Sequence, residues 1–315
     1  MPQPRVSETA PGGRFVRQPN WFTGQITADG SSGYPAEAGR YHLYVSLACP
    51  WSHRCLIVRR LLGLETIIGV TAVDPVTDEK GWRFTSSADG RDPLTGAFYL
   101  SELYAVTDPG YPGQVTVPCL WDVRTQQIVS NDFPYLTLNM ETEFRPWHRS
   151  GAPDLYPLAR RDEIDALCTL IYHTVNDGVY RAGLATTQAA YEEAFDALFT
   201  TLDALEERLA RRRFLLGDQI TEADVRLYPT LARFDAVYYA LHRCNMCRLV
   251  DYPNLWGYAR DLYQRAGFGD TTDFGQIKRH YFQAQPELSP SRIVPRGPYV
   301  NWLSPHDRQR LPERP

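Results

Sequence analysis

The first third of the chain alternates between short apolar runs and one helical pattern. Residues 41–47 (YHLYVSL) alternate and predict a buried strand. Residues 50–62 predict a helix that begins at a proline, where the missing N–H costs nothing, and that stops at Gly63. The β-branched run 66–73 (TIIGVTAV) predicts a second strand. The order strand, helix, strand predicts a parallel pair with a right-handed crossover.

Residues 74–114 are irregular, and regular patterns resume after them. A loop of this length often carries function or short elements of its own. Residues 114–122 (QVTVPCLWD) predict a strand interrupted at Pro118, and a turn with a cis Val117–Pro118 bond would accommodate this proline. A short strand and a helix are then predicted, over residues 127–130 and 132–144.

The second half of the chain is helical in pattern. Periodic apolar positions predict helices over residues 163–175, 188–212, 222–241 and 253–266. Thr221 and Asp224 have the spacing of a capping box at the start of the third helix. The predicted fold class is therefore α/β plus all-α. Its parts are an N-terminal arm (1–40), an α/β domain (41–145), an all-helical domain (160–282) and a C-terminal tail (283–315).

Composition narrows the class of protein. The chain has 315 residues, 43% of them hydrophobic, enough for one large or two medium domains. The net charge of −4 and the lack of a long basic run argue against a nucleic acid or an anionic membrane as partner. No apolar stretch reaches about 18 residues, and the N-terminus lacks the apolar core of a signal peptide. A cytoplasmic protein is the default expectation.

Six cysteines in so long a chain are more typical of free thiols than of a disulfide framework. Cys244 and Cys247 have the spacing of half a zinc site, but no second such pair completes it, so we expect packing and no metal.

Cys49 is the cysteine with a distinctive position. It lies in the sequence SLACPWSHRC, where the first strand is followed by the first helix. A helix N-terminus presents unpaired N–H groups and a partial positive charge, and both favour a thiolate. His53 and Arg54 lie within one turn and would add positive potential. Cys49 is thus a candidate nucleophile, although cysteine is also a common buried packing residue.

Further motifs are spread over most of the chain. They are 48–54 (ACPWSHR), 81–84 (GWRF), 111–122 (YPGQVTVPCLWD), 175–183 (VNDGVYRAG), 220–238 (ITEADVRLYPTLARFDAVY), 275–282 (GQIKRHYF) and 293–298 (IVPRGP). Together they resemble the glutathione transferase superfamily, and more narrowly its Xi class, the glutathionyl-hydroquinone reductases. The resemblance implies a thioredoxin-like thiol-binding domain followed by a helical bundle domain for the substrate and for dimerisation. It also implies a homodimer.

The resemblance further implies a thiol-exchange reaction on a thiol conjugate of a quinone or related aromatic. The Cys49 thiolate attacks the sulfur of the conjugate, the hydroquinone leaves, and a second thiol resolves the mixed disulfide. Three tyrosines match the aromatic-substrate pocket of the family and would donate hydrogen bonds to the substrate oxygens: Tyr180, Tyr238 and Tyr281. Trp82 matches a tryptophan beside the thiol-binding site. The backbone of Val117, before Pro118, matches the position that pairs with the bound thiol.

The sequence departs from the family pattern around this thiol site. Asp132 and Phe133 stand where glutathione-using members have a Glu-Ser pair, the next residue is Pro134, and Gln114 replaces an arginine. A buried ligand carboxylate without those partners would be costly. The NDFP sequence resembles the actinobacterial branch of the family, and those organisms commonly use mycothiol, a sugar-linked cysteine derivative without a γ-glutamyl group. The predicted low-molecular-weight thiol is therefore mycothiol rather than glutathione.

Two other functions are compatible with the sequence. The altered thiol pocket would suit a natural-product tailoring transferase that forms or cleaves C–S bonds. A non-catalytic binding module with a transferase-like fold is the other alternative, and the retained Cys49, Trp82 and tyrosines count against it.

Overall fold

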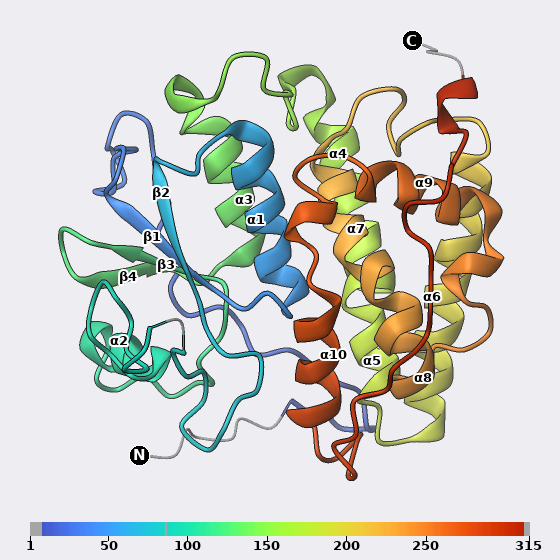
Figure 1. The fold of residues 1–315 in the computed structure, drawn as a ribbon, viewed down its shortest axis with the longest axis horizontal. Coiled ribbons are helices and arrows are strands. Elements are labelled where there is room, and N and C mark those ends of the chain that lie inside the picture. Colours follow the sequence, from blue (N-terminus) through green and yellow to red (C-terminus); the bar gives the residue numbers. More distant parts are fainter. Residues whose placement is uncertain (1–7, 86, 312–315) are drawn as a thin grey trace. The chain divides into compact units, whose positions relative to one another are not determined.

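The computed structural model describes residues 8–85 and 87–311. The ends of the predicted arm (1–7) and tail (312–315), and Ser86, lie outside the described residues. The described chain forms two compact units (Figure 1). The first contains residues 18–152 and 275–286, and the second contains 8–17, 153–274 and 287–311. The predicted arm is thus divided between the units at residue 17, and the end of the predicted helical domain groups with the α/β unit.

A mixed four-stranded sheet forms the centre of the first unit (Figure 1). Its strands are β1 (Tyr41–Val45), β2 (Ile68–Ala72), β3 (Cys119–Asp122) and β4 (Gln127–Ser130), in the order β2-β1-β3-β4. β1 and β2 pair in parallel with Tyr41 opposite Ile68, which confirms the predicted strand–helix–strand unit. β3 runs antiparallel to both β1 and β4.

The helices of this unit follow the sequence pattern in part. α1 spans Pro50–Leu62, as predicted, and ends at Gly63, which adopts a left-handed φ of 75°. α3 (Phe133–Thr142) packs against α1. α2 (Leu100–Thr107) lies within the segment predicted to be irregular, and α10 (Phe274–Gln283) was not predicted as a helix.

The strand predicted over 114–122 is shorter than expected. The Val117–Pro118 peptide bond is cis, as predicted, and β3 begins only at Cys119. A proline has no N–H to donate to a ladder, so pairing starts after it. The segment 115–117 is therefore irregular chain that leads into β3 rather than part of the sheet.

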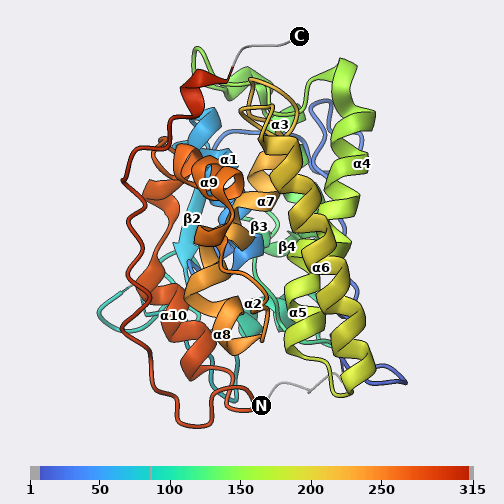
Figure 2. The same ribbon diagram turned by 90° about the vertical axis from the view of Figure 1, so that its right-hand side faces the viewer.

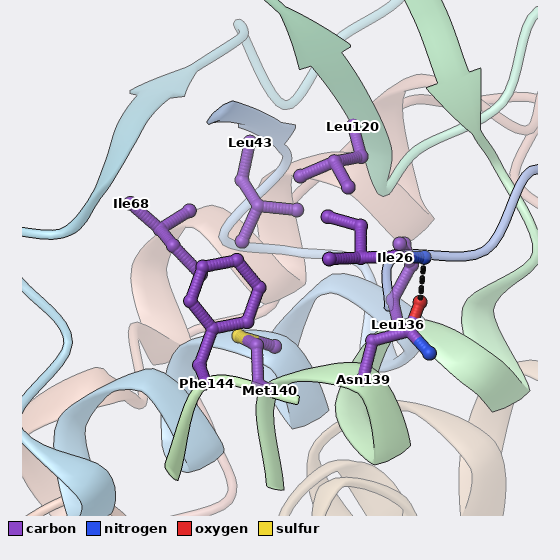
Figure 3. A pocket seen from close by; sticks show the side chains of 8 residues that line it. All are labelled: Ile26, Leu43, Ile68, Leu120, Leu136, Asn139, Met140 and Phe144. Atoms are coloured by element: carbon purple, nitrogen blue, oxygen red, sulfur yellow. Dashed lines mark hydrogen bonds between the residues drawn. The ribbon is translucent and has the colours of Figure 1, made fainter. Parts of the chain in front are cut away.

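One small apolar pocket lies between the sheet and α3 (Figure 3). Eight residues line it: Ile26, Leu43, Ile68, Leu120, Leu136, Asn139, Met140 and Phe144. The volume open to the centre of a water molecule is only ≈ 10 Å³, about enough for one water. It is a gap in the core, closed by the arm residue Ile26, whose N–H donates to Asn139 Oδ1 at 3.1 Å.

The second unit is helical (Figure 2). Its helices are α4 (Arg161–Ile171), α5 (Gly178–Gly183), α6 (Gln188–Leu209), α7 (Glu222–Arg233), α8 (Tyr239–Leu241) and α9 (Pro253–Tyr263). The predicted capping box is present at the start of α7, where Asp224 accepts the Thr221 N–H at 2.8 Å. π-Helical turns at Tyr172–Asn176 and Phe234–Tyr238 interrupt two predicted helices. No helix in the described part of the chain is long and apolar enough to cross a membrane.

Candidate active site

Cys49 is the N-cap residue of α1, with extended backbone angles (φ −76°, ψ 126°). Its carbonyl accepts the His53 N–H at 3.0 Å, which starts the helix. Its thiol donates to the carbonyl oxygen of Val117 at 3.3 Å. The side chain keeps 8% of its surface exposed. The candidate nucleophile therefore lies next to the backbone that is predicted to pair with the thiol co-substrate.

The first turn of α1 is positively charged and buried. Arg54 is 2% exposed, and its guanidinium lies 4.6 Å from the ring centroid of Trp51. His53 is fully buried in the same turn. The helix N-terminus at Cys49 and the Arg54 guanidinium one turn further along α1 are thus two sources of positive potential in this part of the fold.

Trp82 binds the same segment, residues 115–117. Its indole N–H donates to the carbonyl oxygen of Val115 at 3.2 Å. The ring is half-buried and stacks on His280 of α10, with centroids 5.4 Å apart and planes at 22°. Thus Cys49 and Trp82 both bind the backbone of 115–117, one through each valine carbonyl.

The start of α3 offers no backbone donor to an anion. The Phe133 N–H donates to Asn131 O at 3.1 Å, and the Tyr135 N–H to Asp132 O at 3.0 Å. Pro134, between them, has no N–H. The usual anion-binding property of a helix N-terminus is therefore absent from these positions.

Asp132, the N-cap residue of α3, places a carboxylate at the start of this helix. Burial raises its pKa above the usual range, and a hydrogen bond from the Asn20 amide to Oδ1, at 2.8 Å, opposes that rise. Among the described residues, the second oxygen, Oδ2, has no hydrogen-bond partner. The position thus presents a hydrogen-bond acceptor rather than a cation or a hydroxyl.

Phe133 is a packing residue in this structure. Its ring is 7% exposed and lies 4.4 Å from that of Trp51, with the planes at 31°. The sequence assigned Phe133 to the thiol site because of its position after Asp132. Its ring is occupied by the contact between α1 and α3.

Gln114 is bound through its backbone to the N-terminal arm. The side chain of Gln18 donates to Gln114 O at 2.7 Å and accepts the Gln114 N–H at 2.9 Å. Asn131 Oδ1 accepts the N–H groups of Trp21 and Phe22 at 3.2 and 3.0 Å. Sequence reasoning did not identify Gln18, Asn20 or Asn131, because isolated amides in an aperiodic segment give no pattern.

The three predicted tyrosines are divided between the two units. Tyr281, on α10, is 1% exposed and belongs to the unit that contains Cys49. Tyr180, on α5, and Tyr238, in a π-helical turn, belong to the other unit. Their hydroxyl oxygens are 3.4 Å apart and both side chains are buried.

An arginine of the arm completes the environment of Tyr180. The Arg17 guanidinium lies 4.9 Å from the Tyr180 ring centroid. Its Nε and Nη2 both donate to Asp177 Oδ1, at 3.0 and 2.9 Å. A cation on the face of a phenol ring is attracted by the ring and strengthens its hydroxyl as a donor.

Of the remaining cysteines, Cys247 is of intermediate exposure and the other four are buried. Cys244 is fully buried, and burial raises the pKa of its thiol to about 12. Its sulfur contacts the carbonyl oxygen of His242 at 3.7 Å. The described residues contain no group of three His, Cys, Asp or Glu side chains placed to hold a metal ion.

Comparison with known proteins identifies the family. Residues 188–261 match the family model described as Glutathione S-transferase, C-terminal domain. Glutathionyl-hydroquinone reductase YqjG of Escherichia coli (strain K12) is 45% identical over 305 residues, covering 94% of this chain and 93% of the relative. The glutathione-bound structure of YqjG superposes with a TM-score of 0.87, at 44% identity over 92% of this chain and 97% of that one.

Two further solved structures are similar along almost their whole length. A glutathione transferase from Gordonia bronchialis DSM 43247 has a TM-score of 0.91 and 51% identity, covering 93% of this chain and 92% of that one. The glutathione-S-transferase Xi from Phanerochaete chrysosporium has a TM-score of 0.89 and 43% identity, covering 94% of this chain and 96% of that one. This chain therefore belongs to the glutathione transferase superfamily, in the Xi class of the glutathionyl-hydroquinone reductases.

Proposed function

We propose that this protein is a thiol-dependent reductase that removes a thiol from conjugated hydroquinones or related aromatics, with Cys49 as its nucleophile. The observation that carries the proposal is the position of Cys49 at the N-cap of α1, with its sulfur 3.3 Å from Val117 O. A sulfur held at a helix N-terminus and beside an extended backbone can attack a thiol conjugate bound along that backbone.

The reaction proceeds in two exchanges. The Cys49 thiolate attacks the sulfur of the conjugate, so an S–S bond forms and the C–S bond to the aromatic ring breaks. The electron pair of that bond stays with the ring, which takes up a proton and leaves as the hydroquinone. A second thiol then attacks the mixed disulfide, releasing the disulfide of the two thiol molecules and regenerating Cys49.

The tyrosines act as hydrogen-bond donors to the oxygens of the aromatic substrate in this proposal. Donation to an oxygen that gains negative charge as the C–S bond breaks would lower the barrier. Tyr180 and Tyr238 are supported by their paired hydroxyls, 3.4 Å apart. Tyr281 is supported by its place in the same unit as Cys49. Trp82 and the backbone around Val117 and cis Pro118 position the thiol.

We propose mycothiol rather than glutathione as the thiol, with Gln114, Asp132 and Phe133 at the altered positions. YqjG is a glutathionyl-hydroquinone reductase by name, and its solved structure contains glutathione. Here the N–H groups at the start of α3 are used within the chain, and Asp132 is an acceptor. A ligand carboxylate next to Asp132 would be repelled, whereas sugar hydroxyls could donate to it.

The test compares the reduced, hydroquinone forms of glutathione-linked and mycothiol-linked menadione, each incubated separately with the protein and with Cys49→Ala. We expect release of the hydroquinone and an adduct of the thiol's mass on Cys49 with the mycothiol conjugate, and neither with Cys49→Ala. Equal or faster turnover of the glutathione conjugate would contradict the choice of thiol and leave the reductase chemistry intact. No release from either conjugate, with Cys49 still reactive, would contradict the reductase and favour a tailoring transferase or a binding module.

The oligomeric state belongs to the same proposal. The resemblance implies a homodimer, and light scattering of the purified protein tests it. A monomer at micromolar concentration would contradict it.

A further inference from the structure

α10 carries a histidine, His280, that binds the loop after β2. His280 Nδ1 lies 2.6 Å from the carbonyl oxygen of Pro75. A carbonyl oxygen only accepts hydrogen bonds, so Nδ1 is the protonated nitrogen and donates. On the same helix, Arg279 Nη2 lies 3.8 Å from Asp74 Oδ1. These contacts attach α10 to the loop that follows β2.

The His280 ring covers one face of Trp82. Their centroids are 5.4 Å apart and the planes are nearly parallel, at 22°. On its other side along the helix, the His280 ring meets that of Tyr281 edge-on, at 5.1 Å and 78°. His280 thus stands between the tryptophan of the predicted thiol site and a tyrosine of the predicted aromatic site.

Trp82 needs such support, because it lies in an irregular loop rather than in a helix or strand. Its indole is fixed at two places, by its N–H bond to Val115 O at 3.2 Å and by the stack on His280. Two residues further on, Val117 O accepts the Cys49 thiol. Movement of the indole would therefore release the backbone to which Cys49 is bonded.

We propose that His280 is a positioning residue of the thiol site: by stacking on Trp82 it holds the indole against the 115–117 backbone, and so sets the affinity for the thiol. That a thiol binds beside Trp82 and residues 115–117 rests on the proposed function. The stacking of His280 on Trp82 is observed independently of it. Free rotation of a side chain that must be ordered on binding weakens an interaction. The loss of His280 should therefore act on binding, not on the exchange at sulfur.

Three variants separate the contributions of His280. His280→Asn keeps a donor for Pro75 O and removes the ring, whereas His280→Phe keeps a ring on Trp82 and removes the donor. Arg279→Ala is the matched control, since it loosens the same helix from the same loop. We expect His280→Asn to weaken thiol binding roughly three- to ten-fold, and His280→Phe and Arg279→Ala to stay within about two-fold.

Binding is measured by calorimetry on Cys49→Ser protein, with glutathione and mycothiol as separate probes. A second set of variants carries Trp82→Phe in addition, which completes a double-mutant cycle. If His280 acts through Trp82, His280→Asn has no further effect once Trp82 is replaced. In turnover, His280→Asn should raise KM for the thiol with kcat unchanged. Full additivity in the cycle, or an equal loss in His280→Asn and Arg279→Ala, would overturn the proposal.

A fluorescence measurement tests the contact without any thiol. The signal of Trp82 is the difference between each protein and its Trp82→Phe counterpart. Acrylamide should quench this signal roughly twice as strongly in His280→Asn as in the parent or in Arg279→Ala, because the ring that covers the indole is gone. Equal quenching would overturn the proposal. If neither thiol binds the parent, the proposed function fails, and this measurement still decides the role of His280.

Discussion

The thiol of Cys49 donates a hydrogen bond to the backbone carbonyl of Val117, 3.3 Å away. Cys49 comes from the N-terminus of α1, and Val117 from the extended chain before β3. The contact brings together two parts of the sequence that are 68 residues apart. Cys49 is buried, but it keeps a small exposed fraction of 8%.

Cys49 should therefore differ from the other cysteines in its reactivity. It keeps 8% exposure, and Cys247 is of intermediate exposure. The other four thiols are more deeply buried than Cys49, at 0–2% exposure: Cys55, Cys119, Cys168 and Cys244. We expect iodoacetamide to modify Cys49 and Cys247 in the native protein and the buried thiols at least roughly 100-fold more slowly, because these require opening of the fold. Peptide mass mapping over time measures the rates.

Cys119 is the internal control for this experiment, since burial raises the pKa of its thiol well above the usual range. In Cys49→Ala, Cys247 should be the one thiol that still reacts rapidly. Modification of Cys119 at the rate of Cys49 would contradict the described burial.

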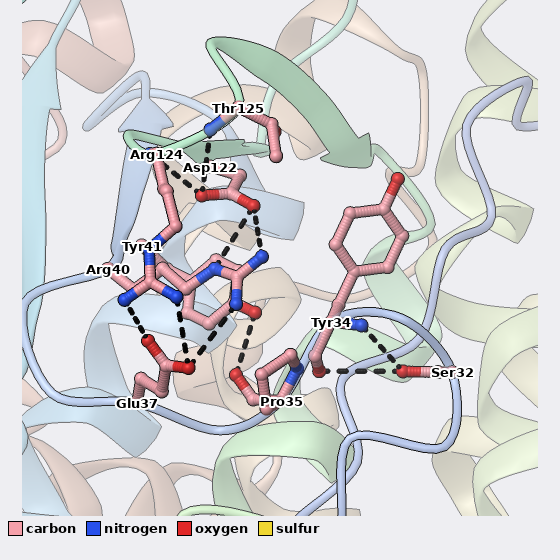
Figure 4. Close-up of polar contacts among 9 residues, drawn as sticks. All are labelled: Ser32, Tyr34, Pro35, Glu37, Arg40, Tyr41, Asp122, Arg124 and Thr125. Carbon is pink, nitrogen blue, oxygen red and sulfur yellow. Dashed lines mark hydrogen bonds and ion pairs between the residues drawn. The ribbon is translucent and has the colours of Figure 1, made fainter.

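A buried ion pair joins the start of β1 to the end of β3 (Figure 4). The guanidinium of Arg40 donates to Asp122 Oδ2 through Nη2 at 2.7 Å and through Nε at 3.1 Å. Burial acts to raise the pKa of Asp122, but the bonds from Arg40 and from the Arg124 N–H outweigh it, so that the pKa lies below its usual range. The folded state therefore stabilises the ionised carboxylate.

The sign of the pH dependence follows from that shift. A carboxylate whose pKa is lowered by folding contributes stability above the unfolded-state value of about 3.9, and this is lost as pH falls through the folded-state pKa. Asp122→Asn should lower the free energy of unfolding at pH 7 by about 3–5 kcal/mol, and it should flatten the loss of stability below about pH 4. Urea denaturation at several pH values measures both.

Arg60→Ala is the matched control. Arg60 pairs with Glu65 at 2.6 Å on the surface, with 52% of the arginine side chain exposed. Its loss should change stability by less than about 1 kcal/mol. A loss as large as that of Asp122→Asn would show that burial does not decide the strength of these pairs.

The sequence correctly predicted those parts of the fold that depend on residues adjacent in the chain. The bounds of α1, the stop at Gly63, the cis bond before Pro118 and the capping box at Thr221 were all predicted, because each depends on a few adjacent residues. Their physical causes are the fixed φ of proline, the freedom of glycine and a side chain within reach of its own helix end.

Contacts between distant segments could not be predicted in the same way. His280 binds Pro75 across 205 residues, and Asn20 binds Asp132 across 112. Single polar side chains in aperiodic segments carry no signal of their partner. The contact of Phe133 with Trp51 is another that its motif does not reveal. The motifs predict where the thiol site lies, and the structure adds the long-range contacts around those residues.

Arg17 should matter more than its neighbour Arg14, although both belong to the arm. Arg17 binds the buried Asp177 and covers the Tyr180 ring. Arg14 pairs with Glu193 on the surface, where 54% and 47% of the two side chains are exposed. We expect Arg17→Ala to lower the free energy of unfolding by about 2 kcal/mol, from a cation–π contact and an unpaired carboxylate, and Arg14→Ala to have a much smaller effect because its ion pair is exposed to solvent.

Turnover separates the effect on Tyr180 from the effect on stability. If Arg17 strengthens Tyr180 as a donor, Arg17→Ala should lower hydroquinone release several-fold at a temperature where both variants are fully folded. The same loss in Arg14→Ala would mean that the arm as a whole, and not the cation on the ring, is responsible.

Gln114 offers a direct test of thiol choice. Its side chain is exposed, while Gln18 holds its backbone N–H and carbonyl, so a substitution leaves the chain in place. Gln114→Arg restores the cation of the family pattern. An exposed charge-assisted contact should strengthen glutathione binding about five-fold, or roughly 1 kcal/mol. Gln127→Arg adds the same charge at another exposed position and should have no effect. An equal gain in both variants would indicate general attraction of an anionic ligand.

Asp132 is held in the fold at a cost to stability, and this cost points to a role in binding. Burial raises its pKa. An acid whose pKa is raised by folding binds more protons when folded, so its contribution to stability falls as pH rises through the folded-state pKa. Asp132→Asn keeps a partner for Asn20 and removes the charge. It should therefore raise stability at pH 7, by at most about 1 kcal/mol because solvent screens a half-buried group.

The same substitution should weaken the use of mycothiol, because a carboxylate is the stronger acceptor for hydroxyl groups. Its effect on the conjugate of glutathione should be smaller or opposite in sign, since a repulsive charge is removed. Urea denaturation and turnover of the two menadione conjugates measure these outcomes together. A variant that is more stable and equally active with both conjugates would show that Asp132 does not contact the thiol.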